Sequence, residues 1–434
     1  MLYRVLLALL FIVTLVAVIA YARGYRFDVK DTSLSSNGLV AVTSAPRSAK
    51  VFVNDNLKGI TDLNLYLEPE TYTITIVKDG YFPWTKTIKV FGEVVQSIDA
   101  TLYPINSSLS PLTNIGVVKA IPFGTGEQKV LILSANMTAS ITPTQSTPSP
   151  TATESDQKQG IFVYDSRNQA VSFFPSLTYV LDYNFLGSDI DPKKIEVLFS
   201  PKFDQAIIFN NPQYEDKSKT LKSQFDPVYE FPISFDTAHL INLNENNNSP
   251  LDITISAQSV IDAWTSQKST EVDVLLSGYE KPLHQFILDN TVIVDLSLDK
   301  MRILYEATAS AKLNPILKNP LIGSNQTPEI RDVKPNALYL YDVKEDKNYQ
   351  ILDANELSKQ HTFPSFHPNG KDLVLNEQNS ISIADYDGLN RQKVYSGPYD
   401  TNFYVVTTDG RVLILTNLNP ALNQYSDLYA VGIK

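Results

Sequence analysis

Few residues of this chain have the types and spacing that chemistry requires. His361 and His367 are separated by a predicted turn, which is not the spacing of a metal-binding pair on a helix. Asp385, Asp387 and Gly388 are spaced as at the start of a calcium-binding loop, but the downstream bidentate Glu is missing. A β-turn with Asp and Gly in favoured positions explains these three residues better. We therefore predict no metal site and no cofactor.

Motifs for nucleophilic or phosphoryl chemistry are also missing from the sequence. It contains no Gly-x-Ser-x-Gly, no His-Glu-x-x-His and no glycine-rich phosphate loop. The chain has no cysteine, which excludes disulfides, thiolate nucleophiles and Cys-ligated zinc. A carboxylate pair for glycoside cleavage cannot be selected from 47 acidic residues without geometry. The motifs therefore indicate no enzyme.

One aromatic cluster could bind a ligand. Tyr81, Phe82 and Trp84 lie close together in the sequence, and exposed aromatic rings can stack on sugars. The alternative is that Trp84 and Tyr81 fill the core of a small domain, which needs large apolar side chains to be stable. The sequence allows both interpretations, and Tyr81, Phe82 and Trp84 are the candidate ligand-binding residues.

Composition limits the kind of protein. A length of 434 residues allows two or three domains, and 43% hydrophobic residues can bury a substantial core. The formal net charge of -11 argues against nucleic acid as a partner, because phosphate neutralisation needs basic patches. An exported protein without cysteine needs no oxidative folding, which suits a bacterial surface.

The N-terminal segment is expected to reach a membrane. The run Val5–Tyr21 is uncharged, and at about 17 residues it forms roughly 25 Å of helix, near the lower limit for a bilayer. A cleaved signal peptide is possible at Ala20-Tyr21-Ala22, but we favour a retained transmembrane anchor at residues 1–26. Tyr and Arg then form an interfacial collar, and the rest of the chain lies outside the cytoplasm.

Residues 27–37 are expected to be a juxtamembrane linker, and residues 38–104 a small β-sandwich. Short segments with alternating apolar residues, such as Thr71 to Val77, are separated by turns such as Lys78-Asp79-Gly80. Seven short strands within this length predict an antiparallel sandwich.

This region resembles the PEGA domain family. The order of glycine, proline and alternating apolar positions that carries the resemblance comprises Gly38, Val40, Ser44, Pro46, Ala49, Val51, Val53, Gly59, Thr61, Leu67, Pro69, Tyr72, Ile74, Ile76, Gly80, Tyr81 and Leu102. The departures fall in turns, at 54–56, Asp62 and Glu70. The resemblance implies an envelope or surface protein of bacteria or archaea, without catalytic residues in this domain.

Two polar stretches interrupt the remainder. Residues 105–112 are expected to link two domains. Residues 137–159 are rich in Ser, Thr and Pro and cannot bury enough apolar area to order themselves. Because strand-like segments flank this insert, we expect a disordered loop inside the second domain, with O-glycosylation as an alternative.

Residues 113–434 contain a repeated strand–turn–strand pattern. Its clearest unit comprises a His-Pro-Asn-Gly-Lys turn at 367–371, a strand, and Asp385-x-Asp387-Gly388 after another strand. This unit resembles a repeat of TolB-like propellers, with His367 and Asn369 replacing the usual Ser and Asp. A spacing of about 40–45 residues is typical of four-stranded blades.

The expected fold is therefore all-β after the N-terminal helix, with a β-propeller of about six or seven blades and no long helix. A pair of β-sandwiches is the alternative. We expect a non-catalytic, membrane-anchored envelope protein whose partners are envelope polysaccharide or surface proteins. The alternative is an extracellular glycan-active enzyme with its site in the propeller channel.

Overall fold

The computed structural model describes residues 2–22, 25–28, 33–124, 129–135, 159–166, 176–187, 190–211, 225 and 235–433. Nearly all of the Ser/Thr/Pro-rich insert expected at 137–159 lies outside the described residues. The strands on either side of it, β12 (Lys129–Ser134) and β13 (Gly160–Asp165), are antiparallel neighbours in one sheet. The insert therefore connects two strands of the same sheet.

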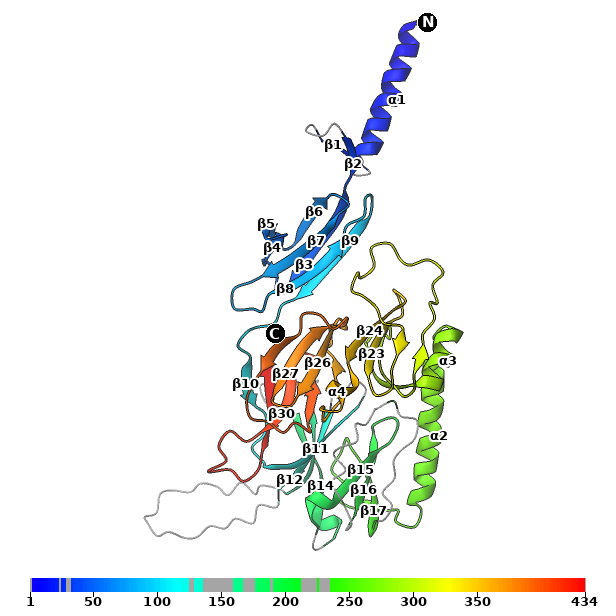
Figure 1. Cartoon of the computed structure of the whole chain (residues 1–434). Coiled ribbons are helices and arrows are strands. Elements are labelled where there is room, and N and C mark those ends of the chain that lie inside the picture. The colour runs from blue at the N-terminus through cyan, green and yellow to red at the C-terminus, as the bar shows by residue number, and fades with distance from the viewer. Residues whose placement is uncertain are drawn as a thin grey trace, which may run out of the picture.

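The chain begins with helix α1 (Leu2–Ala22), followed by the paired strands β1 (Tyr25–Asp28) and β2 (Ser33–Ser36). Figure 1 shows α1 extending away from the rest of the molecule. Among the described residues, no helix has both the length and the apolar character needed to cross a membrane. The transmembrane anchor expected at residues 1–26 is therefore not supported.

Residues 38–104 form the expected small β-sandwich, called the sandwich below. One sheet has the strand order β6-β3-β9 and the other β5-β4-β7-β8. The seven strands are β3 (Gly38–Ala45), β4 (Lys50–Val53), β5 (Asn56–Ile60), β6 (Leu63–Leu67), β7 (Thr71–Val77), β8 (Trp84–Lys89) and β9 (Val95–Thr101). The expectation of a purely antiparallel fold was wrong, because β3 and β9 pair in parallel.

The sandwich is held by alternating apolar side chains. Along β3 every second residue is buried, and Val40 and Val42 are fully inaccessible to solvent. They pack against Ile74 and Ile76 of the opposite sheet in one cluster. Since successive side chains of a strand point to opposite faces, this alternation places one face of each sheet in the core.

Five four-stranded sheets follow within the described residues, each used here as one propeller blade. Blades 1 and 2 consist of β11 (Val117–Phe123), β12, β13 and β14 (Ser176–Asp182), and of β15 (Ile195–Phe199), β16 (Gln205–Asn210), β17 (Thr237–Asn242) and β18 (Leu251–Asp252). Blade 3 consists of β19 (Thr291–Leu296), β20 (Arg302–Ala307), β23 (Leu338–Asp342) and β24 (Lys347–Leu352). Blade 4 consists of β25 (Ser365–Phe366), β26 (Asp372–Glu377), β27 (Ser380–Asp385) and β28 (Gln392–Tyr395).

Blade 5 closes the ring with a strand from the other end of the domain. Its order is β10-β31-β30-β29, so β10 (Ser108–Pro111) forms its outer strand beside β31 (Asp427–Gly432). The other two strands are β29 (Tyr404–Val406) and β30 (Val412–Thr416). Part of the stretch expected as a linker is thus a propeller strand. One apolar cluster joins Val130 of blade 1 to Leu413 of blade 5.

A helical pair lies between blades 2 and 3. Helix α2 (Ala257–Leu276) packs Ile261 and Trp264 against Phe209 of blade 2. Helix α3 (Lys281–Asn290) packs Phe286 against Tyr305 of blade 3. The pair therefore packs on both blades, and the two helices follow one side of the propeller in Figure 1.

The structure differs from the expected all-β fold with six or seven blades. After the sandwich, the described residues form five four-stranded sheets, and α2, α3 and the short α4 (Ala354–Leu357) are helical. The small β21 (Ala311–Lys312) and β22 (Asp332–Val333) pair within the long connection of blade 3. The expected blade number followed from chain length, and part of that length is used by helices and connections.

Removing the Trp264 side chain tests the helical pair. Trp264→Ala should lower the free energy of unfolding by about 3–5 kcal/mol, because it leaves a cavity between α2 and blade 2. The matched control on the same helix is Val274→Ala, whose side chain is 68% exposed. Chemical denaturation of both variants measures the difference, and equal stabilities would contradict the packing of α2 on blade 2.

Candidate functional site

Two turns of blade 4 meet one end of the sandwich. The first, residues 367–371, precedes β26, and the second, residues 385–390, leads from β27 to β28. Both contact β8 or the segment 99–103 of the sandwich through hydrogen bonds and ion pairs. These are the two turns of the clearest sequence repeat, so the repeat marks the joint between the domains.

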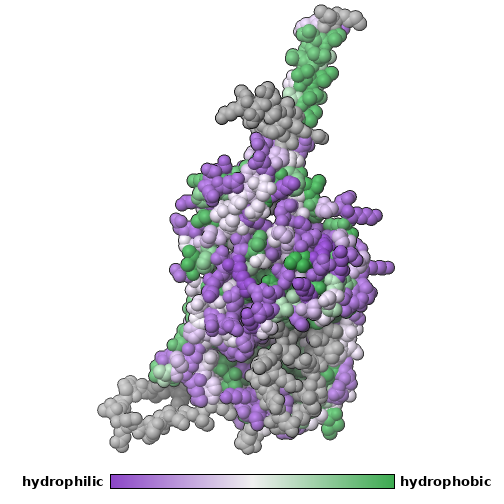
Figure 2. Space-filling view, viewed as in Figure 1, coloured by the Kyte–Doolittle hydropathy of each residue, from purple (hydrophilic) through white to green (hydrophobic). Residues whose placement is uncertain are grey.

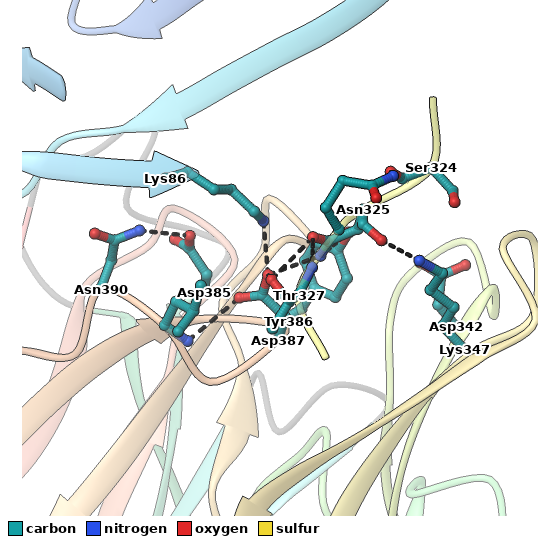
Figure 3. Close-up of polar contacts among 12 residues, drawn as sticks. Lys86, Ser324, Asn325, Thr327, Asp342, Lys347, Asp385, Tyr386, Asp387 and Asn390 are labelled. Atoms are coloured by element: carbon teal, nitrogen blue, oxygen red, sulfur yellow. Dashed lines mark hydrogen bonds and ion pairs between the residues drawn. The ribbon is translucent and has the colours of Figure 1, made fainter. Parts of the chain in front are cut away.

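The second turn is a β-turn. The Gly388 N–H donates to the Asp385 carbonyl at 2.8 Å, and Gly388 has φ +82. This left-handed conformation favours glycine. The turn directs the Asp385 and Asp387 side chains toward the sandwich (Figure 3). The acidic pair therefore serves as a set of hydrogen-bond acceptors for the neighbouring domain.

Asp387 is a buried carboxylate that a sandwich lysine neutralises. Its side chain is 0% exposed and lies 2.6 Å from the Lys86 ammonium, which is 13% exposed. The Thr327 hydroxyl donates to the same oxygen at 2.6 Å, and the Asn325 amide at 2.7 Å (Figure 3). Burial alone would raise the pKa of Asp387, but Lys86 and these donors hold it below its usual value.

Asp385 makes the second contact of this turn. The Trp84 indole N–H donates to one of its oxygens at 3.0 Å, and the Asn390 amide donates to the same oxygen at 2.9 Å. Burial, with the neighbouring Asp372 and Asp387 carboxylates, raises the pKa of Asp385 to about 7. The joint therefore contains one carboxylate held ionised and one that titrates near neutrality.

The first turn and the adjoining Asp372 of β26 add three contacts. The Tyr103 hydroxyl donates to Asp372 at 2.6 Å, and Asn369 donates to the Thr101 hydroxyl at 3.1 Å. Lys371 forms an ion pair with Asp99. Burial and the Asp372 charge raise the pKa of Tyr103 far above its usual value, so this hydroxyl remains a donor.

Arg302 of β20 supports the two turns from blade 3. Its guanidinium lies 4.2 Å from the centre of the Tyr386 ring, within cation–π range. It also donates to the Gly370 carbonyl at 2.8 Å and pairs with Asp342 at 3.0 Å. One side chain thus contacts both turns and joins blade 3 to blade 4.

The predicted ligand-binding aromatics lie in the core or at this joint. Trp84 is 6% exposed and belongs to the sandwich core, and Tyr81 packs against the same core. Phe82 packs against an apolar cluster of blades 4 and 5 that includes Tyr103. Trp84 is therefore buried, whereas Tyr81 and Phe82 are partly exposed. The core interpretation matches the positions of Trp84 and Tyr81.

The two spaced histidines are not brought together as a metal site. His367 is 3% exposed and packs edge-on against Tyr103, whereas His361 lies on the surface. Within the described parts of the chain, no group of three or more His, Asp or Glu side chains could hold a metal ion. The clustered polar groups of the joint are suited to holding two domains together.

Sequence reasoning missed the partners of the acidic turn. Lys86 precedes Asp387 by about 300 positions, and Asn325 and Thr327 lie in an irregular connection without a motif. The only signal in the sequence for such partners was the turn itself, which contains two carboxylates although a β-turn does not require both.

Breaking the buried ion pair should weaken the whole molecule. Lys86→Met leaves the Asp387 charge without its cation and should lower the free energy of unfolding by roughly 3 kcal/mol. Lys58→Met, at an exposed position of β5, is the matched control and should change stability little. Denaturant titration measures both, and equal losses would contradict a structural role for the pair.

Asp385 should make stability depend on pH. Because its folded pKa is raised from 3.8 to about 7, its contribution is complete below about pH 4 and is lost as the pH rises through about 7. Asp385→Asn should remove this part of the pH dependence. Thermal unfolding of wild type and variant from pH 4 to 8 measures it, with the exposed Asp55→Asn as control. Parallel curves for wild type and Asp385→Asn would contradict the assignment.

Comparison with known proteins confirms the resemblance to the PEGA domain family. Residues 37–106 match the model of the PEGA domain family. No curated protein matches the chain.

Three of the solved structures that match the chain are 7–10% identical to it and have TM-scores of 0.20–0.24. A TolB-type protein of Agrobacterium tumefaciens has 9% identity and a TM-score of 0.21, over 72% of this chain and 70% of that one. The WD40 domain of Neurospora crassa Pan2 has 10% identity and a TM-score of 0.24, over 92% and 96%. An oligogalacturonate lyase of Vibrio parahaemolyticus has 7% identity and a TM-score of 0.20, over 91% and 88%.

The propeller interpretation rests on the strand order, the ring closure by β10 and the inter-blade cores. The chain thus carries a PEGA domain at residues 37–106, docked on a β-propeller.

Proposed function

We propose that this chain is a non-catalytic cell-envelope protein whose PEGA domain and propeller together form one binding or scaffolding platform. A PEGA domain joined to a propeller fits a surface or envelope protein. The observation that carries the proposal is the joint between them. Its buried polar groups bind one another, through Lys86–Asp387 and Tyr103–Asp372, and so hold the domains in one orientation.

Attachment to the membrane through the N-terminal segment belongs to this proposal. The described side chains of α1, residues 3–19, are all exposed, although the run is apolar. Figure 2 shows this helix as a hydrophobic projection from a largely hydrophilic face. A helix that is apolar all round calls for an apolar environment. The domains after it are proposed to lie outside the cytoplasm.

Cell fractionation and binding assays test the proposal. The full chain, expressed in a bacterium, should be found in the membrane fraction and be cleaved by protease added outside the cytoplasmic membrane. Deletion of residues 2–22 should release it from that fraction. Recovery of the intact chain in the cytoplasm would contradict the proposed location.

The purified full chain should bind a component of an envelope-glycan array or a panel of surface proteins saturably. The same glycans should remain uncleaved after long incubation. Cleavage of a glycan would instead support the alternative, a glycan-active enzyme with its site in the propeller channel.

A further inference from the structure

The free edge of the PEGA domain lies in a groove between the two domains. Strand β8 pairs only with β7 and therefore forms an edge of its sheet. A groove of about 440 Å³ is lined by Thr71, Thr85, Lys86, Thr87, Ile88, Lys89, Gln326, Thr327, Pro328 and Leu389. Since side chains of a strand alternate between faces, five consecutive residues of β8 can line one groove only where it follows the backbone edge.

The hydrogen bonds of β7 show which way the β8 backbone points. Thr87 stands opposite Thr73 in the β7–β8 ladder. The Thr73 N–H donates to the Asn54 side chain at 2.9 Å, and its carbonyl accepts from the Asn54 N–H at 2.9 Å. Thr73 therefore offers no backbone group to Thr87, although their hydroxyls lie 3.4 Å apart. The N–H and carbonyl of Thr87 point away from β7 and toward the groove.

Side chains bind the two ends of this edge. The Thr85 N–H donates to the Asn390 side chain at 2.9 Å, and the Lys89 carbonyl accepts from the Gln96 side chain at 3.0 Å. Between these points lie the Thr85 carbonyl, both backbone groups of Thr87 and the Lys89 N–H. These four groups have no hydrogen-bond partner among the residues that the structure describes. These groups occur at every second residue, which is the spacing at which an added β-strand would form hydrogen bonds with β8.

The walls of the groove restrict what can enter it. Gln326, Thr327 and Pro328 of the blade 3 connection line the same groove as the edge, so a segment that enters it contacts both domains. Leu389 is 40% exposed and offers an apolar contact.

The charge of the groove further restricts which ligand can bind. No carboxylate lines it, and its two lysines differ in state. Lys86 is neutralised by Asp387, whereas Lys89 is exposed and its ammonium lies 5.5 Å from the centre of the Phe91 ring. Although the chain has a net charge of -11, the charge of Lys89 makes this edge locally cationic. A cationic edge favours an acidic ligand.

We propose that this groove binds an extended, acidic peptide segment of a partner protein, which adds to the PEGA domain as a strand beside β8. Backbone hydrogen bonds to Thr85, Thr87 and Lys89 would supply affinity. A carboxylate near Lys89 and an apolar side chain on Leu389 would supply specificity. The proposal rests on the binding function above and assigns the partner class and the surface.

A display library of random seven-residue peptides, selected on the full chain, tests the proposal. Enriched peptides should carry acidic residues, and fluorescence anisotropy should show binding about tenfold weaker for Thr87→Pro, which removes one donor. Proline is compatible with the fold here because this N–H does not pair with β7. Thr87→Ser retains the donor and should bind as wild type does.

Lys89→Glu is a second, independent variant. It should weaken acidic peptides about tenfold and should strengthen a peptide in which lysine replaces the acidic residues. Thermal unfolding checks that each variant is folded. If Thr87→Pro does not fold, the Lys89→Glu result alone tests the proposal.

Three results would overturn the proposal. The first is that no peptide is enriched, and the second is that wild type and Lys89→Glu bind acidic peptides equally. The third is that glycan binding, and not peptide binding, depends on Thr87 and Lys89. None of these would remove the wider binding function, which the envelope-glycan and surface-protein panel tests on other surfaces.

Discussion

The fully buried carboxylate of Asp387 is the constraint on which the arrangement of the two domains depends. A charge removed from water is tolerated only with a counter-charge and satisfied hydrogen-bonding positions. Lys86 of the PEGA domain supplies the charge, and Thr327 and Asn325 of the propeller supply the other bonds. Separating the domains would return Lys86 to water and leave the carboxylate with neutral donors only. The pair therefore favours one docked arrangement over others.

The remaining contacts extend this constraint over blade 4. Trp84 and Tyr103 are apolar over most of their surface, and each donates one hydrogen bond to an aspartate in or beside a blade 4 turn. Arg302 connects the same turns to blade 3. Docking is therefore coupled to the propeller ring, and the ring is itself closed by β10, the strand that directly follows the PEGA domain. The two domains share both a joint and a short covalent connection.

Local patterns predicted much of this fold. Alternation along Thr71 to Val77 and the turn at Gly80 placed sandwich strands correctly, because burial on one face imposes a period of two. The turns of blade 4 were recognised because Asp and Gly adopt turn conformations for local reasons.

The features that were not predicted from the sequence depend on long-range packing. Helix α2 buries only Ala257, Ile261, Trp264 and Leu276, too few to stand out as a period of 3.6. The parallel pairing of β3 with β9 joins segments more than 50 positions apart. The role of Asp387 was hidden for the same reason, since an ion pair between distant residues leaves no local pattern.

Rigidity of the joint is the central claim, and an interdomain distance measures it directly. The chain contains no cysteine, so Lys58→Cys on the PEGA domain and Asn355→Cys on the propeller allow two spin labels without background. Pulsed electron paramagnetic resonance should give a single narrow distance distribution that broadens when Lys86→Met is added. A broad distribution in the otherwise unaltered chain would contradict the account, because the domains would then move independently.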